Sequence, residues 1–317
     1  MKTFADHKRY YTWNQALRET FGGKVFKVPI DAGFDCPNRD GTAATGGCTF
    51  CTVSGSGDMI IAPEAPLPVQ FQKEVDMMHQ KWPHANQYLV YFQNFTNTHA
   101  PVEILRERYE KVINEEGVVG ICIGTRPDCL PDETIEYLSE LNQRYYLWVE
   151  LGLQTTFDET SRAINRAHDY QTYVDAVKRL RKHHINVCTH LINGLPGETT
   201  EMMIENVRRV ICDSDIQGIK LHLLHLVKHT KMQQDYASGR LKLMDMATYV
   251  NVICDQIELI PDDIIIQRVT GDAPWDSLIG PMWSLHKWEV LNAIDKELER
   301  RDSWQGKYNA RKEKPNA

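Results

Sequence analysis

The sequence contains no apolar run long enough to cross a membrane. Its longest apolar stretches, one around Ile121 and one at 264–266, are far shorter than the ~20 residues that a membrane span requires. The N-terminal stretch MKTFADHKRYYTWN carries positive charge, but it has no apolar segment of the length found in signal peptides. These absences predict a cytoplasmic protein without a membrane partner.

A surplus of positive charge is missing as well. The 317 residues include 36 Lys and Arg against 43 Asp and Glu, which gives a formal net charge of -7. This balance provides no global attraction to nucleic acid, so any contact with nucleic acid must be local. The composition, 42% hydrophobic and 25% charged, is that of a soluble globular protein.

The sequence also has no Pro/Ser-rich linker or low-complexity stretch that would divide it. From residue 85 onward, short runs rich in β-branched and aromatic residues alternate with segments of helical periodicity, which indicates repeated βα units around a parallel sheet. The predicted strands span 24–31, 87–94, 118–125, 145–153, 185–193, 218–226 and 264–270. The predicted helices span 101–114, 131–143, 170–184, 199–213 and 246–260.

The pattern changes after residue 274. A Trp-rich segment leads into a predicted helix at 283–301, and the polar sequence GKYNARKEKPNA follows. We therefore expect one catalytic domain, residues 1–274, and a C-terminal helical extension with a polar tail, residues 275–317.

Cysteine is plentiful, with eight in the chain. Because cytosolic thiols stay reduced, metal binding or catalysis explains them better than a disulfide framework does. Three of them lie in the sequence AGFDCPNRDGTAATGGCTFC, within a Gly-rich loop, 32–58, that leaves the first predicted strand. Eleven residues separate Cys36 from Cys48, and two separate Cys48 from Cys51.

Three thiolates suit an iron-sulfur cluster and leave one iron without a protein ligand, as a reactive metal centre requires. The alternatives are a structural zinc site and three unrelated buried thiols. Zinc sites usually close with four ligands at paired spacings, and no second CxxC pair follows in the chain. The missing fourth cysteine therefore favours an open cluster.

The sequence CPNRDG followed by GGCTFC resembles the cluster loop of the radical SAM (S-adenosylmethionine) superfamily, in the expanded-spacing form of the YtqA/YhcC-like family. Further segments agree in order with that family: YFQNFTNTHAP, GTRPD, ELGLQT, HLINGLPGET and LHLLHLVKHT. All of them fall at the carboxyl ends of predicted strands, where barrel enzymes build their active sites. The family in turn resembles the radical SAM domain of the Elongator catalytic subunit.

The resemblance implies an α/β fold, namely a partial parallel (β/α)6-type barrel with a C-terminal helical extension. It implies that Cys36, Cys48 and Cys51 hold a 4Fe-4S cluster whose open iron is chelated by SAM. It also implies reductive cleavage of SAM to a 5′-deoxyadenosyl radical, with an electron donor such as flavodoxin or ferredoxin.

Several contacts to SAM follow from the same resemblance. Phe50 would pack near the adenine, with simple loop packing as the alternative. Gln93 and Asn94 stand where the superfamily usually has a GGE-like segment, so we expect an amide or backbone contact in place of a carboxylate. Asn193 and Gly194 would allow the backbone to approach the ribose and adenine closely.

Polar residues at the ends of the third and fourth predicted strands are further candidates. Glu150 and Gln154 alternate with apolar neighbours, so both should face the barrel interior, where they need a partner or a ligand. Thr125 and Arg126 follow the third strand, and Arg126 would bind SAM or an anionic substrate. Arg166 resembles an arginine that pairs with the SAM carboxylate, for which a fork-shaped guanidinium is suited, with a solvated surface arginine as the alternative.

Three histidines, His190, His222 and His225, are candidates for substrate contact or proton transfer, with a structural role as the alternative for each. Cys129 lies near the end of the third strand, where it could donate a hydrogen atom. The other cysteines sit in apolar patterns and are expected in the core: Cys122, Cys188, Cys212 and Cys254.

The resemblance implies that the substrate is tRNA, modified on the carbon-5 side chain of its wobble uridine. Local basic stretches agree with this, namely Lys8 and Arg9 beside aromatic residues and the segment 178–182, although each also fits a solvated face. Two other functions remain open: a radical SAM enzyme for a small metabolite or peptide, with the aromatic N-terminus covering the barrel base, and a non-catalytic cluster-binding sensor.

Overall fold

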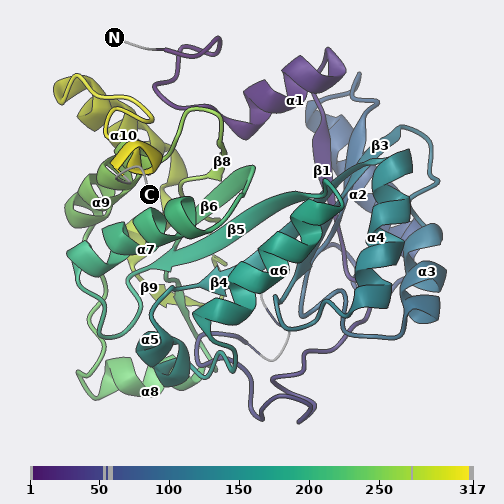
Figure 1. Cartoon of the computed structure of the whole chain (residues 1–317), viewed down its shortest axis with the longest axis horizontal. Helices are drawn as coiled ribbons and strands as arrows, with labels where there is room; N and C mark the ends of the chain where they lie inside the picture. Colours follow the sequence, from purple (N-terminus) through teal and green to yellow (C-terminus); the bar gives the residue numbers. More distant parts are fainter. Residues whose placement is uncertain (1–2, 53–54, 56–59, 273, 314–317) are drawn as a thin grey trace.

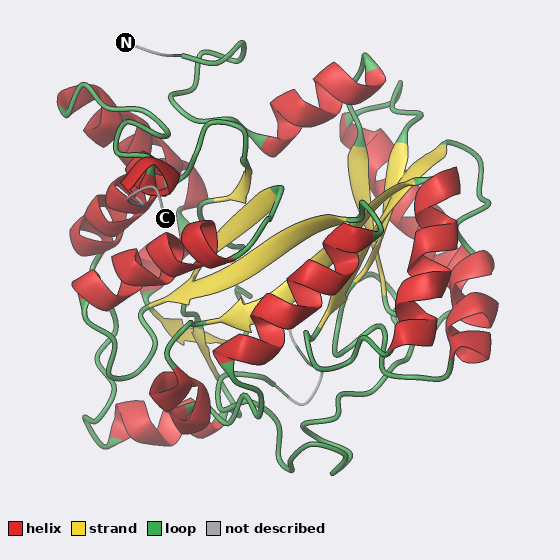
Figure 2. Cartoon of the chain, in the orientation of Figure 1, coloured by secondary structure: helices red, strands yellow, loops and turns green. Residues whose placement is uncertain are grey.

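The computed structural model describes residues 3–52, 55, 60–272 and 274–313. Part of the predicted cluster loop (53–54 and 56–58) and the last four residues of the predicted tail (314–317) lie outside the described residues. Within them, seven strands form one parallel sheet in the order β1-β2-β3-β4-β5-β6-β8, which curls as a partial barrel (Figures 1 and 2). Its strands are β1 (Phe26–Ile30), β2 (Tyr88–Phe92), β3 (Val118–Thr125), β4 (Tyr146–Gln154), β5 (Asn186–Asn193), β6 (Gly218–Leu223) and β8 (Ile265–Arg268).

Each of these strands lies within, or within one residue of, a strand predicted from the sequence, and neighbours in the sheet are consecutive in that series. Parallel neighbours need a crossover, and helices supply it on the outer face of the sheet (Figure 1). The α/β partial barrel is therefore confirmed. A separate two-stranded antiparallel sheet joins β7 (Leu226–Val227) to β9 (Leu278–Gly280).

The helices that the sequence predicted are all found, with ends that differ by up to four residues. They are α3 (Val102–Glu110), α4 (Asp132–Arg144), α6 (Tyr170–Lys182), α7 (Thr200–Asp213), α9 (Met246–Leu259) and α10 (Lys287–Arg300). The structure adds α1 (Trp13–Phe21), α2 (Leu67–Lys81), α5 (Asp158–Ala163), α8 (Lys231–Ala237), η1 (Met282–Leu285) and η2 (Ala310–Glu313).

The single helix predicted at 283–301 is wrong at its start. A short 3-10 turn, η1, occupies Met282–Leu285, and His286 is non-helical with φ -96 and ψ 57 before α10 begins. The Trp283 indole donates a hydrogen bond of 3.0 Å to the carbonyl oxygen of Met244 and packs against Tyr249. These tertiary contacts hold the turn in place, so helical periodicity alone predicted too long a helix.

The barrel interior is layered because side chains alternate across each strand. The layer at the base is apolar and contains Leu89, Cys122, Trp148, Cys188 and Ile265. Trp13 of α1 covers this layer, since its ring meets Trp148 edge-on with 5.2 Å between the centroids. The aromatic N-terminus thus covers part of the end of the barrel at which the strands begin.

The layer above the base is charged and contains Lys27, Glu150 and Lys220. The next layer lines a cavity at the carboxyl ends of the strands. The register of the strands fixes which of these residues are neighbours on adjacent strands. Glu150 pairs with Cys188, His190 with Lys220, and Ile192 with His222. On the outer face, Val149, Leu151 and Leu153 of β4 are buried in the main hydrophobic core.

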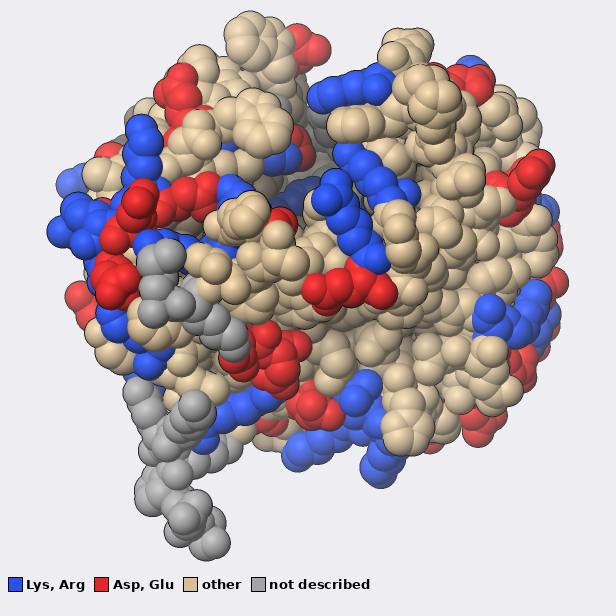
Figure 3. Space-filling view, turned by 90° about the horizontal axis from the view of Figure 1, so that it is seen from above, with Lys and Arg blue, Asp and Glu red and all other residues tan. Residues whose placement is uncertain are grey.

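Side chains of both charge signs lie on the end at which the strands begin. Figure 3, seen from the side on which Figure 1 draws α1, has Lys and Arg interspersed with Asp and Glu around a hollow. Among the described residues, no helix is both long enough and apolar enough to span a membrane.

Candidate active site

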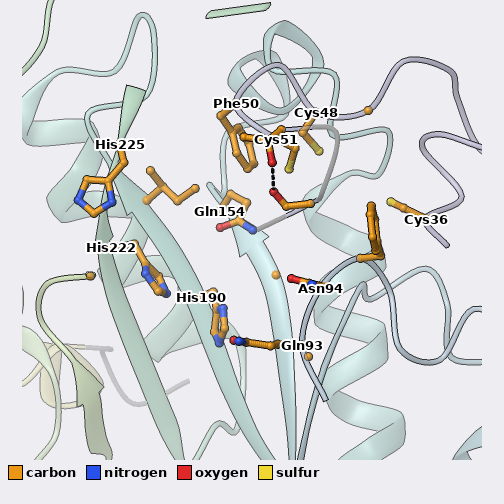
Figure 4. A pocket seen from close by; sticks show the side chains of 18 of the residues that line it. Cys36, Cys48, Phe50, Cys51, Gln93, Asn94, Gln154, His190, His222 and His225 are labelled. Atoms are coloured by element: carbon orange, nitrogen blue, oxygen red, sulfur yellow. Dashed lines mark hydrogen bonds between the residues drawn. The ribbon is translucent and has the colours of Figure 1, made fainter. Parts of the chain in front are cut away.

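A cavity of about 310 Å³ opens where the strands end. Most of the site residues predicted from the sequence line it together: Cys36, Cys48, Phe50, Cys51, Gln93, Asn94, Thr125, Arg126, Glu150, Gln154, Arg166, His190, His222 and His225. Figure 4 shows the cysteines at one end of this cavity and the three histidines at the other.

Two of the three predicted cluster ligands are adjacent. A hydrogen bond from Cys51 lowers the pKa of the Cys48 thiol well below its usual value, although burial opposes this shift, and the Arg166 charge adds to it. The buried Asn38 also directs its side-chain nitrogen at the Cys48 sulfur, 3.4 Å away. Cys36 lies apart from this pair, across the cavity mouth (Figure 4).

The three thiols fit a cubane cluster better than a single metal ion. Among the described residues, no three metal-ligating side chains converge on one point. In a 4Fe-4S cubane each thiolate binds a different iron, so the thiols must surround a space and need not meet. Cys36, Cys48 and Cys51 line one cavity in this way, and a thiolate-stabilising cation lies beside them.

Arg166 is buried, which excludes the solvated surface arginine considered for it. Its Nε donates to the carbonyl oxygen of Gly152 at 3.0 Å, and its Nη1 lies 3.6 Å from the Cys48 sulfur. A Cβ at position 152 would be 2.9 Å from Nη2 of Arg166, so only glycine lets the guanidinium approach the strand this closely. The arginine thereby links β4 to the cluster loop.

Arg126 lies at the same end of the cavity and is almost fully buried. It makes a two-point ion pair with Asp128, with distances of 2.9 Å from Nε and 2.6 Å from Nη2. Its Nη1 has no hydrogen-bond partner among the described residues. The neighbouring Thr125 hydroxyl is 2.5 Å from the Thr98 hydroxyl, so it belongs to a buried polar layer.

Three amide side chains present polar atoms to the cavity. Asn94 and Gln154 adopt left-handed backbone angles, φ 68 and 76, which are rare for residues other than glycine. Their side-chain oxygens are buried without a partner in the described part of the chain, while the Asn94 nitrogen donates to Asp31 at 2.7 Å. Gln93 also lines the cavity, near His190 in Figure 4. These unmatched acceptors suit a ligand that carries N–H or O–H donors.

Asn193 and Gly194 do not line the cavity, contrary to their predicted place beside SAM. The Asn193 side chain exchanges two hydrogen bonds with Gln256, of 2.9 and 2.8 Å, deep in the core. Gly194 has φ 92 and turns the chain toward Leu195, which packs in the same apolar cluster as Phe50. The segment therefore supports the cavity wall from behind.

Glu150 lines the cavity floor, but its carboxylate is occupied. Lys27 of β1 and Lys220 of β6 both form ion pairs with it, and His190 Nε2 lies 3.0 Å from Oε2. Burial alone would raise the pKa of Glu150, but the two ammonium groups lower it well below its usual range. Glu150 thus stays ionised and links β4 to β1 and β6 across the barrel interior. Because its carboxylate is already paired, it is unsuited to accept a proton.

The histidines at the far end are held neutral. Burial, with the Lys220 charge adding, lowers the pKa of His190 to about 4. Burial, with the neighbouring Arg268 charge adding, lowers the pKa of His225 to about 4, and burial lowers that of His222 well below its usual value. The Nε2 atoms of His222 and His225 are buried without a partner among the described residues.

Several residues of the site were not predicted from the sequence. Arg39 and Arg268 line the cavity, and Lys27 and Lys220 carry the charge beneath it. Lys220 alternates with His222 along β6, so period-two spacing would have placed both in the interior.

The basic stretches proposed for nucleic acid lie elsewhere. Lys8 pairs with Asp295 of α10, and Arg9 donates to the carbonyl oxygen of Ser303 at 3.1 Å. In α6, Arg179 pairs with Asp132 and Arg181 with Asp215, which is typical of a solvated helix face. Lys8, Arg179 and Arg181 are thus already paired, and neither stretch lines the cavity.

Comparison with known proteins agrees with this geometry. The model of the radical SAM superfamily matches residues 40–210, and that of the radical SAM C-terminal domain matches residues 216–300. The protein YtqA of Bacillus subtilis (strain 168) is 56% identical over 98% of this chain and 96% of its own length. YhcC of Escherichia coli (strain K12) is 37% identical over 89% of this chain and 90% of its own.

More distant matches cover part of larger proteins. The tRNA uridine(34) acetyltransferase of Dehalococcoides mccartyi (strain CBDB1) is 31% identical over 52% of this chain but only 36% of its own length. The solved structure of archaeal Methanocaldococcus infernus Elp3, with an N-terminal deletion, has a TM-score of 0.67 at 16% identity and covers 89% of this chain and 64% of its own. This structure is similar to the present chain in fold.

Proposed function

Because the chain belongs to the radical SAM superfamily, whose members bind a 4Fe-4S cluster and SAM, we propose that it is a tRNA-modifying radical enzyme acting on the carbon-5 side chain of the wobble uridine. The observation that carries the proposal is the single cavity that joins three cysteines to a polar chamber at the carboxyl ends of the strands. Flavodoxin or ferredoxin is the proposed electron donor. All eight cysteines are free thiols, which agrees with the cytoplasmic location that we propose.

Cys36, Cys48 and Cys51 would hold the cluster. When bound, it supplies the electron that cleaves SAM to a 5′-deoxyadenosyl radical. Phe50 would cover the adenine as part of the apolar cluster that contains Ile192, and Gln154 would accept hydrogen bonds from SAM.

The remaining task of the chain is to orient SAM and keep water away from the radical. Arg166 would direct its guanidinium at the SAM carboxylate from its fixed place on Gly152. The neutral imidazoles of His222 and His225 would contact the substrate, since both line the cavity and neither Nε2 atom has a partner among the described residues.

Exposed tryptophans near the cavity support nucleic acid as the substrate. Trp275 is 76% exposed and directly follows Pro274, which lines the cavity. Trp288 is 75% exposed, and an ion pair of 2.7 Å between Lys287 and Asp272 ties its helix to the cavity rim. Single-stranded bases stack on aromatic rings of this kind.

Binding of tRNA at two salt concentrations tests the choice of substrate, because phosphate contacts make affinity fall with salt. Trp275→Ala and Trp288→Ala should each weaken tRNA binding roughly fivefold or more, since stacking is worth ~1–3 kcal/mol per base. Trp82→Ala is the matched control, because that exposed tryptophan follows α2 at the opposite end of the barrel. Salt-independent binding that none of the variants changes would favour a small metabolite or a peptide instead.

The distant relative named as a tRNA uridine(34) acetyltransferase supports the wobble position. Mass spectrometry of tRNA nucleosides from a strain that lacks the gene tests it directly. A changed wobble-uridine nucleoside is expected, and an unchanged profile would contradict the proposal.

A further inference from the structure

The cavity has more positive than negative side chains in its wall. Two acidic residues line it, Glu150 and Asp272, and each is already paired with lysine: Glu150 with Lys27 and Lys220, and Asp272 with Lys287. The arginines of the wall are Arg39, Arg126, Arg166 and Arg268. Neither wall acid therefore pairs with one of these four guanidinium groups.

Three of the four arginines have partners near the cysteine end. Arg126 pairs with Asp128, Arg166 contacts the Cys48 sulfur, and Arg39 donates to the Thr52 carbonyl oxygen at 3.0 Å. Arg268 differs from them, because no hydrogen bond or ion pair holds its guanidinium among the described residues. A half-buried cation of this kind gains most from an anionic partner.

Arg268 belongs to a group at the histidine end of the cavity. It ends β8 next to Lys220 of β6, and its charge acts on both His222 and His225. Both imidazoles also meet at Gly271, where a Cβ would lie 3.3 Å from His225 Cε1 and 3.9 Å from His222 Nδ1. One permanent cation and two neutral rings, whose Nε2 atoms have no hydrogen-bond partner among the described residues, thus line the same end of the cavity.

We propose that Arg268, together with His222 and His225, binds an oxyanion group of the substrate at the end of the cavity opposite the cysteines. A guanidinium supplies two parallel N–H donors, and each neutral imidazole can add one more. The inference rests on the proposed function in that the oxyanion would belong to the modified nucleoside, either as a carboxylate on its side chain or as its own phosphate.

Calorimetric titration of the holoenzyme separates these two sources without any turnover. The oxidised protein is saturated with SAM, which fills the Arg166 end, and is titrated with sodium acetate or sodium phosphate at constant ionic strength. We expect one ion to bind, and at least tenfold more weakly to Arg268→Gln than to the parent. Tighter acetate binding assigns a carboxylate, and tighter phosphate binding assigns a phosphate.

The control is Arg144→Gln, which removes the same charge from an exposed site at the end of α4. Arg268→Lys should recover part of the affinity, because it keeps the charge but loses the two-point geometry. Far-UV circular dichroism and iron content verify that each variant is folded. Equal anion binding by Arg268→Gln and the parent, or no binding to the parent, would overturn the inference.

Turnover then distinguishes failure of the inference from failure of the proposed function. Arg268→Gln should raise the KM for tRNA at least tenfold, whereas Arg144→Gln should leave both this KM and SAM cleavage without tRNA within about twofold. If Arg268→Gln converts tRNA as the parent does, the oxyanion site is wrong and the tRNA function stands. If tRNA is not a substrate but the anion still depends on Arg268, the site stands and the proposed substrate is wrong.

Discussion

The guanidinium of Arg166 lies against the Cys48 thiol, with Nη1 3.6 Å from the sulfur, while its Nε is fixed by the Gly152 carbonyl oxygen. A cation held beside a predicted cluster ligand stabilises the thiolate and makes electron uptake at the site more favourable. The same group points into the cavity that would receive SAM.

Arg166→Gln should therefore weaken SAM binding at least tenfold and make the cluster potential more negative, by on the order of tens of millivolts, because one positive charge is lost. Equilibrium binding and a potentiometric titration followed by electron paramagnetic resonance measure the two effects. Arg162→Gln, on the exposed face of the same short helix α5, is the control. Unchanged SAM affinity in Arg166→Gln would refute the assignment.

Anaerobically reconstituted protein should contain about four irons and four sulfides. Cys36→Ala, Cys48→Ala and Cys51→Ala should each abolish this content, because a cubane with an open iron has no spare protein ligand. Cys212→Ala should keep a full cluster, since that thiol lies in α7 and faces the Ala310 carbonyl oxygen. Iron and sulfide analysis decides, and a full cluster in all three of the first variants would show that the ligands are misassigned.

Glu150→Gln should lower the free energy of unfolding by about 3–5 kcal/mol, because it leaves two buried ammonium groups without their carboxylate. Asp235→Asn breaks the exposed ion pair with Arg240 and should cost no more than about 1 kcal/mol. Urea unfolding of both variants and the parent measures the difference. If Glu150→Gln lost as little free energy of unfolding as Asp235→Asn, the structural role of Glu150 would be contradicted.

Stability should fall as the pH drops from about 6.5 toward 4. The folded protein keeps His190 and His225 neutral with a pKa of about 4, whereas in the unfolded chain each takes up a proton near pH 6.5. The unfolded state then binds more protons, so each histidine removes up to about 1.4 kcal/mol per pH unit.

His225→Gln removes one of these groups and should lose less stability than the parent between pH 7 and pH 5. Urea midpoints at the two pH values give the comparison, and His7→Gln, which changes an N-terminal histidine in a turn, is the control. Equal losses in the parent and in His225→Gln would show that the imidazole is not held neutral.

The order of the fold was predictable because each strand of the parallel sheet has a strong local signal. Buried β-branched and aromatic runs, such as 118–125, ended where the structure ends them. Helix α1 was not predicted, since its short sequence is helical through a Thr12 cap and tertiary contact rather than through length. The division at residue 274 stays a prediction.

The place of a site residue was predictable where a sequence motif carried it, as for the cysteines and Arg166, which line one cavity. It was not predictable where pairing across the barrel decides the role. Glu150 was expected in the interior, yet only the structure brings Lys27 and Lys220 to it from distant strands. Arg268 follows an ordinary apolar run, and only the folded cavity shows that no partner among the described residues holds its guanidinium.

One anaerobic assay tests the central claim most directly. Reduced holoenzyme and SAM are incubated with tRNA from a strain that lacks the gene, and 5′-deoxyadenosine and the tRNA nucleosides are measured in the same samples. We predict that one wobble-uridine nucleoside is converted as 5′-deoxyadenosine accumulates, and that Cys48→Ala abolishes both. An unchanged nucleoside profile, with 5′-deoxyadenosine formed at the same rate with and without tRNA, would contradict the account.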